Sequence, residues 1–155
     1  MTVKTDVDLS SVMEGLDGLV KLRTSLSRSM AVAGGKVLRD EAKERAPVKS
    51  GRLKGAIYLA YKDGRSTDDE VVYSISWNAK VAPHGHLIEF GHAVVRGGKA
   101  GKGGVNIGWA PAKPFLRPAY DAALPRAQQA MIERGRERLP ELLRDLYTPA
   151  DEDFV

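Results

Sequence analysis

One apolar stripe near the amino terminus constrains the fold of this 155-residue chain more than any other feature. Apolar residues recur there at spacings of three and four, with Arg23 as the one polar residue in register: Leu9, Val12, Leu16, Leu19, Leu26, Met30, Ala33 and Val37. This spacing predicts an amphipathic helix. We place the helix over residues 11–46, because Pro47 disfavours helical geometry in the residue before it. Such a helix would be about 54 Å long at ~1.5 Å per residue, which is longer than the diameter of one compact domain of this size.

Part of the stripe therefore has little of its own chain to pack on. One interpretation is that a neighbouring subunit covers it, which predicts an oligomer. The other is that the helix bends or folds back at Gly34 and Gly35, since such pairs are common sites of helix kinks.

Two segments with an alternating pattern follow, as half-buried strands require. One face carries Ile57, Leu59 and Tyr61 in the first segment, and Val71, Tyr73, Ile75 and Trp77 in the second. Residues 63–70 have the composition of a hairpin loop. Residues 86–90 form a short apolar segment, either a strand or one helical turn. A final helix is expected with Pro118 in its first turn, kinked or divided by Pro125 and Pro140.

We therefore predict a single α+β domain over residues 1–155, with a long N-terminal and a C-terminal helix packed on a small antiparallel β-sheet. Residues 92–113 are expected to form a long, flexible, basic loop. Its centre, residues 97–104, holds five glycines and two lysines and no side chain that could anchor a core. Residues 148–155 are expected to form a loose acidic tail.

The net charge of +4 is unevenly distributed. No acidic residue lies between Glu89 and Asp121, whereas this stretch contains Arg96, Lys99, Lys102, Lys113 and Arg117. A basic loop of this kind attracts DNA, RNA or an acidic protein surface, and Arg96, Lys99 and Lys102 are the candidate contacts. A solvated loop without a ligand explains the same composition.

Three histidines and one carboxylate fall within nine residues, at His84, His86, Glu89 and His92. These side chains are suitable zinc ligands, but their spacing matches no zinc motif of known geometry. We expect instead that Glu89 makes a structural ion pair or caps a backbone amide.

Other chemistry has little support in the sequence. The chain has no cysteine and no serine in a Gly-x-Ser-x-Gly turn, and residues 97–104 lack the Gly-Lys-Ser/Thr ending of a phosphate loop. We predict no catalysis, no cofactor and no metal. The sequence also has no apolar run of the ~20 residues that span a membrane, and the lack of cysteine fits a reducing cytoplasm.

Three local motifs occur in a fixed order: Ala-Pro-Val-Lys-Ser-Gly-Arg-Leu-Lys at residues 46–54, Leu-Ile-Glu-Phe-Gly at residues 87–91, and Pro-Ala-Lys-Pro-Phe-Leu-Arg-Pro-Ala-Tyr at residues 111–120. Their order and spacing resemble the tail-completion or tail-component family of long-tailed lambdoid phages and prophages. The chain departs from that pattern at His92, where the family usually has threonine, and in a longer glycine–lysine loop. The resemblance implies a non-enzymatic α+β subunit of a ring, expected to be a hexamer, at the end of the tail tube or in the neck.

The motifs supply candidate residues for structural and interaction roles. Those for the helix-to-strand turn are Pro47, Ser50, Gly51 and Leu53; those for a buried anchor are Glu89, Phe90 and Gly91; and those for docking the last helix are Pro114, Phe115, Leu116 and Pro118. The implied partners are further copies of the chain, tail-tube and head-connector proteins, and DNA in the lumen, with no membrane. The implied location is the virion, and the host cytoplasm during assembly. A rival hypothesis is a small nucleic-acid-binding protein that uses the basic loop, and a third is a zinc hydrolase built on the histidines.

Overall fold

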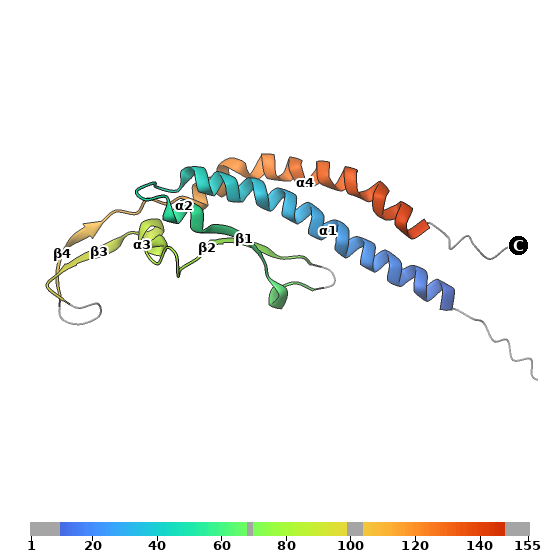
Figure 1. Ribbon diagram of the computed structural model, residues 1–155, viewed down its shortest axis with the longest axis horizontal. Helices are drawn as coiled ribbons and strands as arrows, with labels where there is room; N and C mark the ends of the chain where they lie inside the picture. The colour runs from blue at the N-terminus through green and yellow to red at the C-terminus, as the bar shows by residue number, and fades with distance from the viewer. Residues whose placement is uncertain (1–9, 68–69, 99–103, 148–155) are drawn as a thin grey trace, which may run out of the picture.

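The computed structural model describes residues 10–67, 70–98 and 104–147. In chain order the elements are α1 (Ser10–Arg45), α2 (Arg52–Ala56), β1 (Ile57–Tyr61), the 3-10 turn η1 (Asp63–Arg65), β2 (Tyr73–Trp77), α3 (Gly85–Phe90), β3 (His92–Arg96), β4 (Val105–Ala110) and α4 (Leu116–Tyr147). The two long helices run antiparallel along the molecule in a shallow arch (Figure 1). The β1–β2 hairpin lies beneath α1, and the β3–β4 ribbon extends from the end where α4 begins. The predicted α+β class is confirmed.

Helix α1 begins and ends within one residue of the predicted positions, and it is uninterrupted. The alternative in which it folds back at Gly34 and Gly35 is wrong. Both glycines are buried, and they let neighbouring elements approach closely. A Cβ atom on Gly34 would lie 2.6 Å from Cγ of Met131 in α4, and one on Gly35 would lie 2.8 Å from Cδ1 of Leu59 in β1. The pair therefore serves packing on two sides of a continuous helix.

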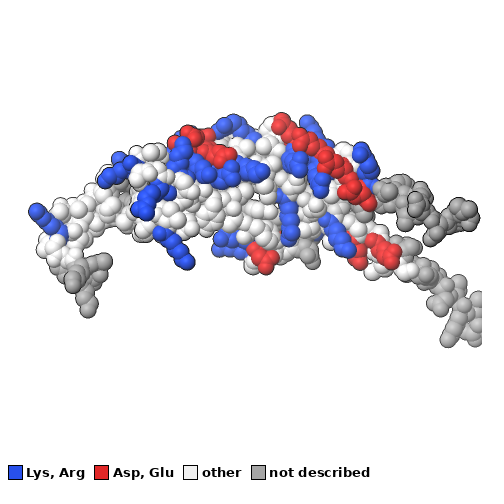
Figure 2. Space-filling view, in the orientation of Figure 1, with Lys and Arg blue, Asp and Glu red and all other residues white. Residues whose placement is uncertain are grey.

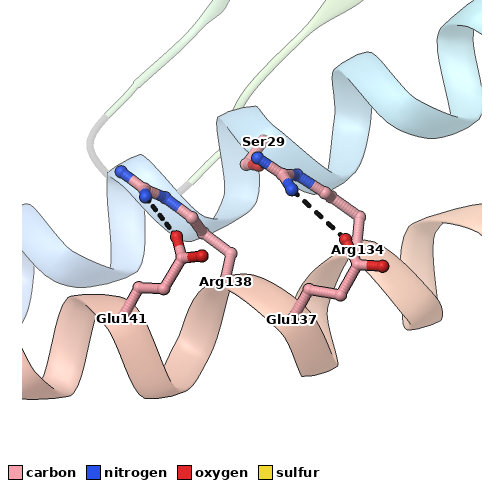
Figure 3. Close-up of polar contacts among 5 residues, drawn as sticks. All are labelled: Ser29, Arg134, Glu137, Arg138 and Glu141. Atoms are coloured by element: carbon pink, nitrogen blue, oxygen red, sulfur yellow. Dashed lines mark hydrogen bonds and ion pairs between the residues drawn. The ribbon is translucent and has the colours of Figure 1, made fainter.

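Polar contacts hold α1 and α4 together on either side of this close approach. Nε of Arg134 donates to Oγ of Ser29 at 2.9 Å, while the same guanidinium pairs with Glu137 one turn further along α4 (Figure 3). Toward the C-terminal end of α1, Glu41 accepts hydrogen bonds from Arg126 of α4 and from Arg45. These two arginines, Arg126 first, lower the pKa of the Glu41 carboxyl.

Strands β1 and β2 pair antiparallel in the register that the alternation predicts. Ile57 lies opposite Trp77, Leu59 opposite Ile75 and Tyr61 opposite Tyr73. This face packs against α1, and Arg28 of α1 stacks 4.8 Å from the ring centre of Tyr61 and donates to its hydroxyl. The connection over residues 63–70 includes η1; Asp68 and Asp69 lie outside the described residues.

The core lies where the ends of α1, α2, the first sheet and α4 meet. Most of its buried apolar members are small, and the set is Ala42, Ala46, Leu53, Ala56, Ile57, Ala82, Phe115 and Ala119. Among the described residues, Phe115 is the one large side chain that is fully buried. Its ring meets that of Trp77 edge-on, with 6.1 Å between the centroids. Alanine and glycine allow the backbones to approach closely, but they leave a thin core.

Helix α4 begins at Leu116, so Pro118 lies in its first turn as predicted. The alternative in which Pro125 and Pro140 divide the helix is wrong, since α4 is continuous through both. A proline in a helix removes one backbone hydrogen bond and exposes the carbonyl four residues earlier. Both internal prolines are exposed, so water reaches the carbonyls that they leave without a backbone donor. The helix curves along its length (Figure 1).

The expected loop over residues 92–113 instead contains β3 and β4, paired antiparallel with a register shift between Val94 and Val95. The physical reason is that two runs rich in β-branched residues flank the glycines, and such residues favour strands. The centre of the expected loop, residues 99–103 with Lys99 and Lys102, lies outside the described residues, as does the predicted acidic tail over residues 148–155.

Candidate assembly surfaces

Glu89 connects the second and third motifs. It is buried, with 7% of its surface exposed, and its Oε2 accepts hydrogen bonds from the backbone N–H groups of Phe115 at 2.8 Å and Leu116 at 3.3 Å. These groups begin α4, where a negative charge also opposes the positive end of the helix dipole. The expectation that Glu89 caps a backbone amide is confirmed. Its carboxylate fixes the start of α4 against α3.

The residues of the first motif form the helix-to-strand turn. Gly51 has a φ of 72°, in the left-handed region that favours glycine. Leu53 is buried in the core, whereas Ser50 is exposed and Pro47 is half-buried. The turn delivers the chain directly from α1 through α2 into β1.

The prediction that Phe90 belongs to a buried anchor is wrong, since 72% of its surface is exposed. Gly91 follows with a φ of 74°, and a Cβ atom there would lie 2.8 Å from the carbonyl oxygen of Ala110. Gly91 ends α3. That helix buries Gly85 and Glu89, which leaves the ring of Phe90 exposed on another face. In the third motif, Phe115 is buried, Leu116 and Pro118 are half-buried, and Pro114 is exposed.

The N-terminal turns of α1 expose an apolar surface. Five large apolar side chains there are between 47% and 58% exposed, namely Val12, Met13, Leu16, Leu19 and Val20. Further along the stripe Leu26, Met30, Ala33 and Val37 are half-buried, and Leu9 lies outside the described residues. The sequence-based expectation that this chain leaves part of its stripe uncovered is therefore confirmed for the described residues.

The β3–β4 ribbon is a second exposed apolar surface, which none of the three sequence motifs predicted. Four of its side chains are 54% to 70% exposed: Val95, Val105, Ile107 and Trp109. The β-branched residues on both sides of the glycines indicate two strands. The basic, glycine-rich composition of the same region instead suggested a loop. The register places Val95 and Val105 on opposite faces, so the ribbon exposes apolar side chains on both. Large exposed apolar surface marks sites of protein–protein contact.

The end of the molecule that carries the ribbon is also basic. Arg96 ends β3, and Lys49, Arg52, Lys113 and Arg117 are exposed in the neighbouring segments. Figure 2 shows lysine and arginine without acidic side chains at this end, whereas side chains of both signs lie over the long helices. Of the predicted contacts, Arg96 is exposed; Lys99 and Lys102 are not described.

An apolar cleft of about 430 Å³ opens where the two long helices and the first sheet meet. Its wall includes Gly34 and Leu38 of α1, Leu59 and Tyr73 of the sheet, and Met131 of α4. The lining is apolar except for two tyrosines, Tyr73 and Tyr120.

The candidate metal ligands are not brought together. Glu89 is engaged with the start of α4, while His84 and His86 are exposed. Within residues 10–67, 70–98 and 104–147, no three histidine, cysteine or acidic side chains form a group that could hold a metal ion. In the same part of the chain, no helix has both the length and the apolar character needed to cross a bilayer.

Comparison with known protein families identifies one that matches this chain. Residues 13–91, just over half of the chain, match the family described as "Bacteriophage HK97-gp10, putative tail-component". The match spans α1 to α3 and includes the first two motifs; the ribbon and α4 follow it. Searches of curated proteins and of solved structures gave no significant match. The chain belongs to the HK97-gp10-like family of phage tail components.

Proposed function

We propose that this tail component is the subunit of a closed ring, expected to be a hexamer, that completes the tail tube or joins it to the head. It acts through protein–protein contacts with further copies of itself and with tail-tube and head-connector proteins, and it performs no catalysis. We expect it in the virion, and in the host cytoplasm during assembly.

The observation that carries this proposal is the exposed apolar surface at the N-terminal end of α1. Five side chains that are about half exposed lie on one short stretch of helix, and the thin alanine-rich core offers nothing to cover them. Burying apolar surface contributes roughly 25 cal/mol per Å², so a partner on this surface would be strongly favoured. A contact between unlike surfaces, repeated around an axis, closes into a ring.

Electron microscopy of particles from a phage strain that lacks the gene tests the proposal. The expected result is full heads and finished tails that remain separate, with joining restored by the gene supplied in trans. Normal numbers of joined, infectious particles without the protein would refute it.

A second candidate, nucleic-acid binding, is favoured by the basic end of the molecule. The exposed cations Lys49, Arg52, Arg96, Lys113 and Arg117 could contact the phosphates of DNA in the lumen. Binding through Z phosphates weakens with a slope of about −0.9Z in a plot of log affinity against log salt. A titration of duplex DNA at several salt concentrations measures this slope, and binding that is absent at low salt would exclude this candidate.

A further inference from the structure

The N-terminal end of α1 extends beyond the helix that should cover it. Gly34 lies against Met131, and Met30 lies against Gly135, which fixes the antiparallel register of α1 and α4. Continued at the same rise per residue, this register brings the last residue of α4, Tyr147, level with about Gly18. The turns that precede Gly18 therefore project past their own partner helix, as Figure 1 shows.

This projecting end is both apolar and acidic. Its exposed apolar side chains include Val12, Met13 and Leu16, and its charged residues between positions 10 and 20 are Glu14 and Asp17, both exposed. A partner that fits it must offer apolar side chains and positive charge together.

The opposite end of the molecule has that chemistry. Val105, Ile107 and Trp109 expose apolar surface on β4, and Arg96 is exposed on the paired strand. Every charged residue in the sequence between Glu89 and Asp121 is a cation. Glu89 itself is buried, so its carboxylate does not offset this charge at the surface. Complementary charge fixes the orientation of a contact and speeds its formation, while the apolar area stabilises it.

We propose that the β3–β4 ribbon of one copy packs on the N-terminal turns of α1 of a second copy. This inference rests on the proposed ring, and it names the two surfaces that meet in it. Because the two surfaces differ and lie at opposite ends of the subunit, each copy presents one free surface of each kind to the next copy. The contact can therefore repeat from subunit to subunit, and it closes into the proposed ring when its rotation divides a full turn.

The absence of cysteine from the chain makes the test direct, since every introduced thiol is unique. Full-length Leu16→Cys and Ile107→Cys variants are mixed in equal amounts and treated with a short bismaleimide, both in concentrated solution and in assembled particles. In particles, where the ring forms, the mixture should give many times more cross-linked product than either variant alone, and a double variant should give a ladder of products longer than two chains. Replacing Ile107→Cys by Ile132→Cys, a comparably exposed position on α4, is the matched control and should give no product with Leu16→Cys.

Charge reversal tests the electrostatic part of the contact. Arg96→Glu should reduce the mixed product roughly two- to fivefold, the size expected of one exposed ion pair, and Asp17→Lys in the other variant should restore it. Arg65→Glu, which reverses an exposed cation on the β1–β2 hairpin, should have no effect. A Leu16–Ile107 product that Arg96→Glu does not reduce would overturn this part.

Particles that contain the protein but give no Leu16–Ile107 product would overturn the inference, as would attachment of Ile107→Cys to a different virion protein. Either result leaves the proposed function standing, because that depends on whether heads and tails join without the protein. A ladder that stops at two chains would contradict continuation of this contact around a ring.

Discussion

Replacing Glu89 by alanine should destabilise the fold by a predictable amount. One buried carboxylate oxygen accepts the backbone N–H groups of Phe115 and Leu116. A hydrogen bond to a charged group contributes about 1.5–3 kcal/mol, and a buried donor left without a partner costs about 1–3 kcal/mol. Because the two bonds share one oxygen and the second is long, we expect a loss of about 2–4 kcal/mol. For a chain of this length that corresponds to a fall of roughly 5–15 °C in Tm.

The assay is urea unfolding followed by far-UV circular dichroism, with the slope against urea compared between variants to check that the same surface is exposed. Glu89→Gln keeps one acceptor oxygen but no charge, so it should lose about 1 kcal/mol. The matched control is Glu44→Ala, whose carboxylate pairs with Lys54 at the surface. An exposed pair of this kind is worth about 0–1 kcal/mol.

Unfolding of Glu89→Ala at the same urea concentration as Glu44→Ala would refute a stabilising role for these two hydrogen bonds. That result would mean that the start of α4 is held by apolar packing alone. A glutamine variant as unstable as the alanine variant would show that the charge, rather than the acceptor oxygen, is what α4 requires.

Three further changes test the packing and the electrostatics of the helix pair. Gly34→Val should lower the free energy of unfolding by about 1–3 kcal/mol because the added side chain collides with α4. Gly15→Ala, with open space around its Cβ, should raise the free energy of unfolding by about 0.5–1 kcal/mol. Urea unfolding measures both changes. Glu41→Gln should be less stable than the natural chain at neutral pH, and this difference should shrink in unfolding curves taken at decreasing pH. The pKa of Glu41 is held below its ordinary 4.5, so its contribution is complete above the pKa of the unfolded chain and is lost as the pH falls through the lower folded value. Phe115→Ala should cost about 3–5 kcal/mol by leaving a cavity, and near-UV circular dichroism should report the altered surroundings of Trp77.

Each of these has a contrary outcome. Equal stability of Gly34→Val and Gly15→Ala would mean that the helices do not approach closely at Gly34. A pH-independent gap between Glu41→Gln and the natural chain would mean that the arginines do not perturb this carboxyl. A Phe115→Ala variant with full stability would place the core elsewhere.

Local patterns in the sequence predicted the elements that depend on near neighbours. The three- and four-residue spacing predicted α1 almost to the residue, and the alternation around Leu59 and Ile75 predicted both strands of the first sheet and their facing sides. For Glu89 the sequence left two roles open, a structural ion pair or a backbone cap, and the contact with Phe115 decided for the cap. For α1 and the two strands the deciding pattern lies within one element, so the sequence carries the information locally.

Tertiary packing decided the rest. Whether Gly34 breaks a helix or admits a partner depends on Met131, which lies far along the chain. The prolines of α4 are tolerated because their side of the helix faces water, which no local pattern records. The ring of Phe90 is exposed because the short helix α3 buries the face that carries Gly85 and Glu89. The sequence alone determined that one long apolar stripe exists; only the folded arrangement, by fixing how far α4 extends along α1, decided which part of it stays exposed.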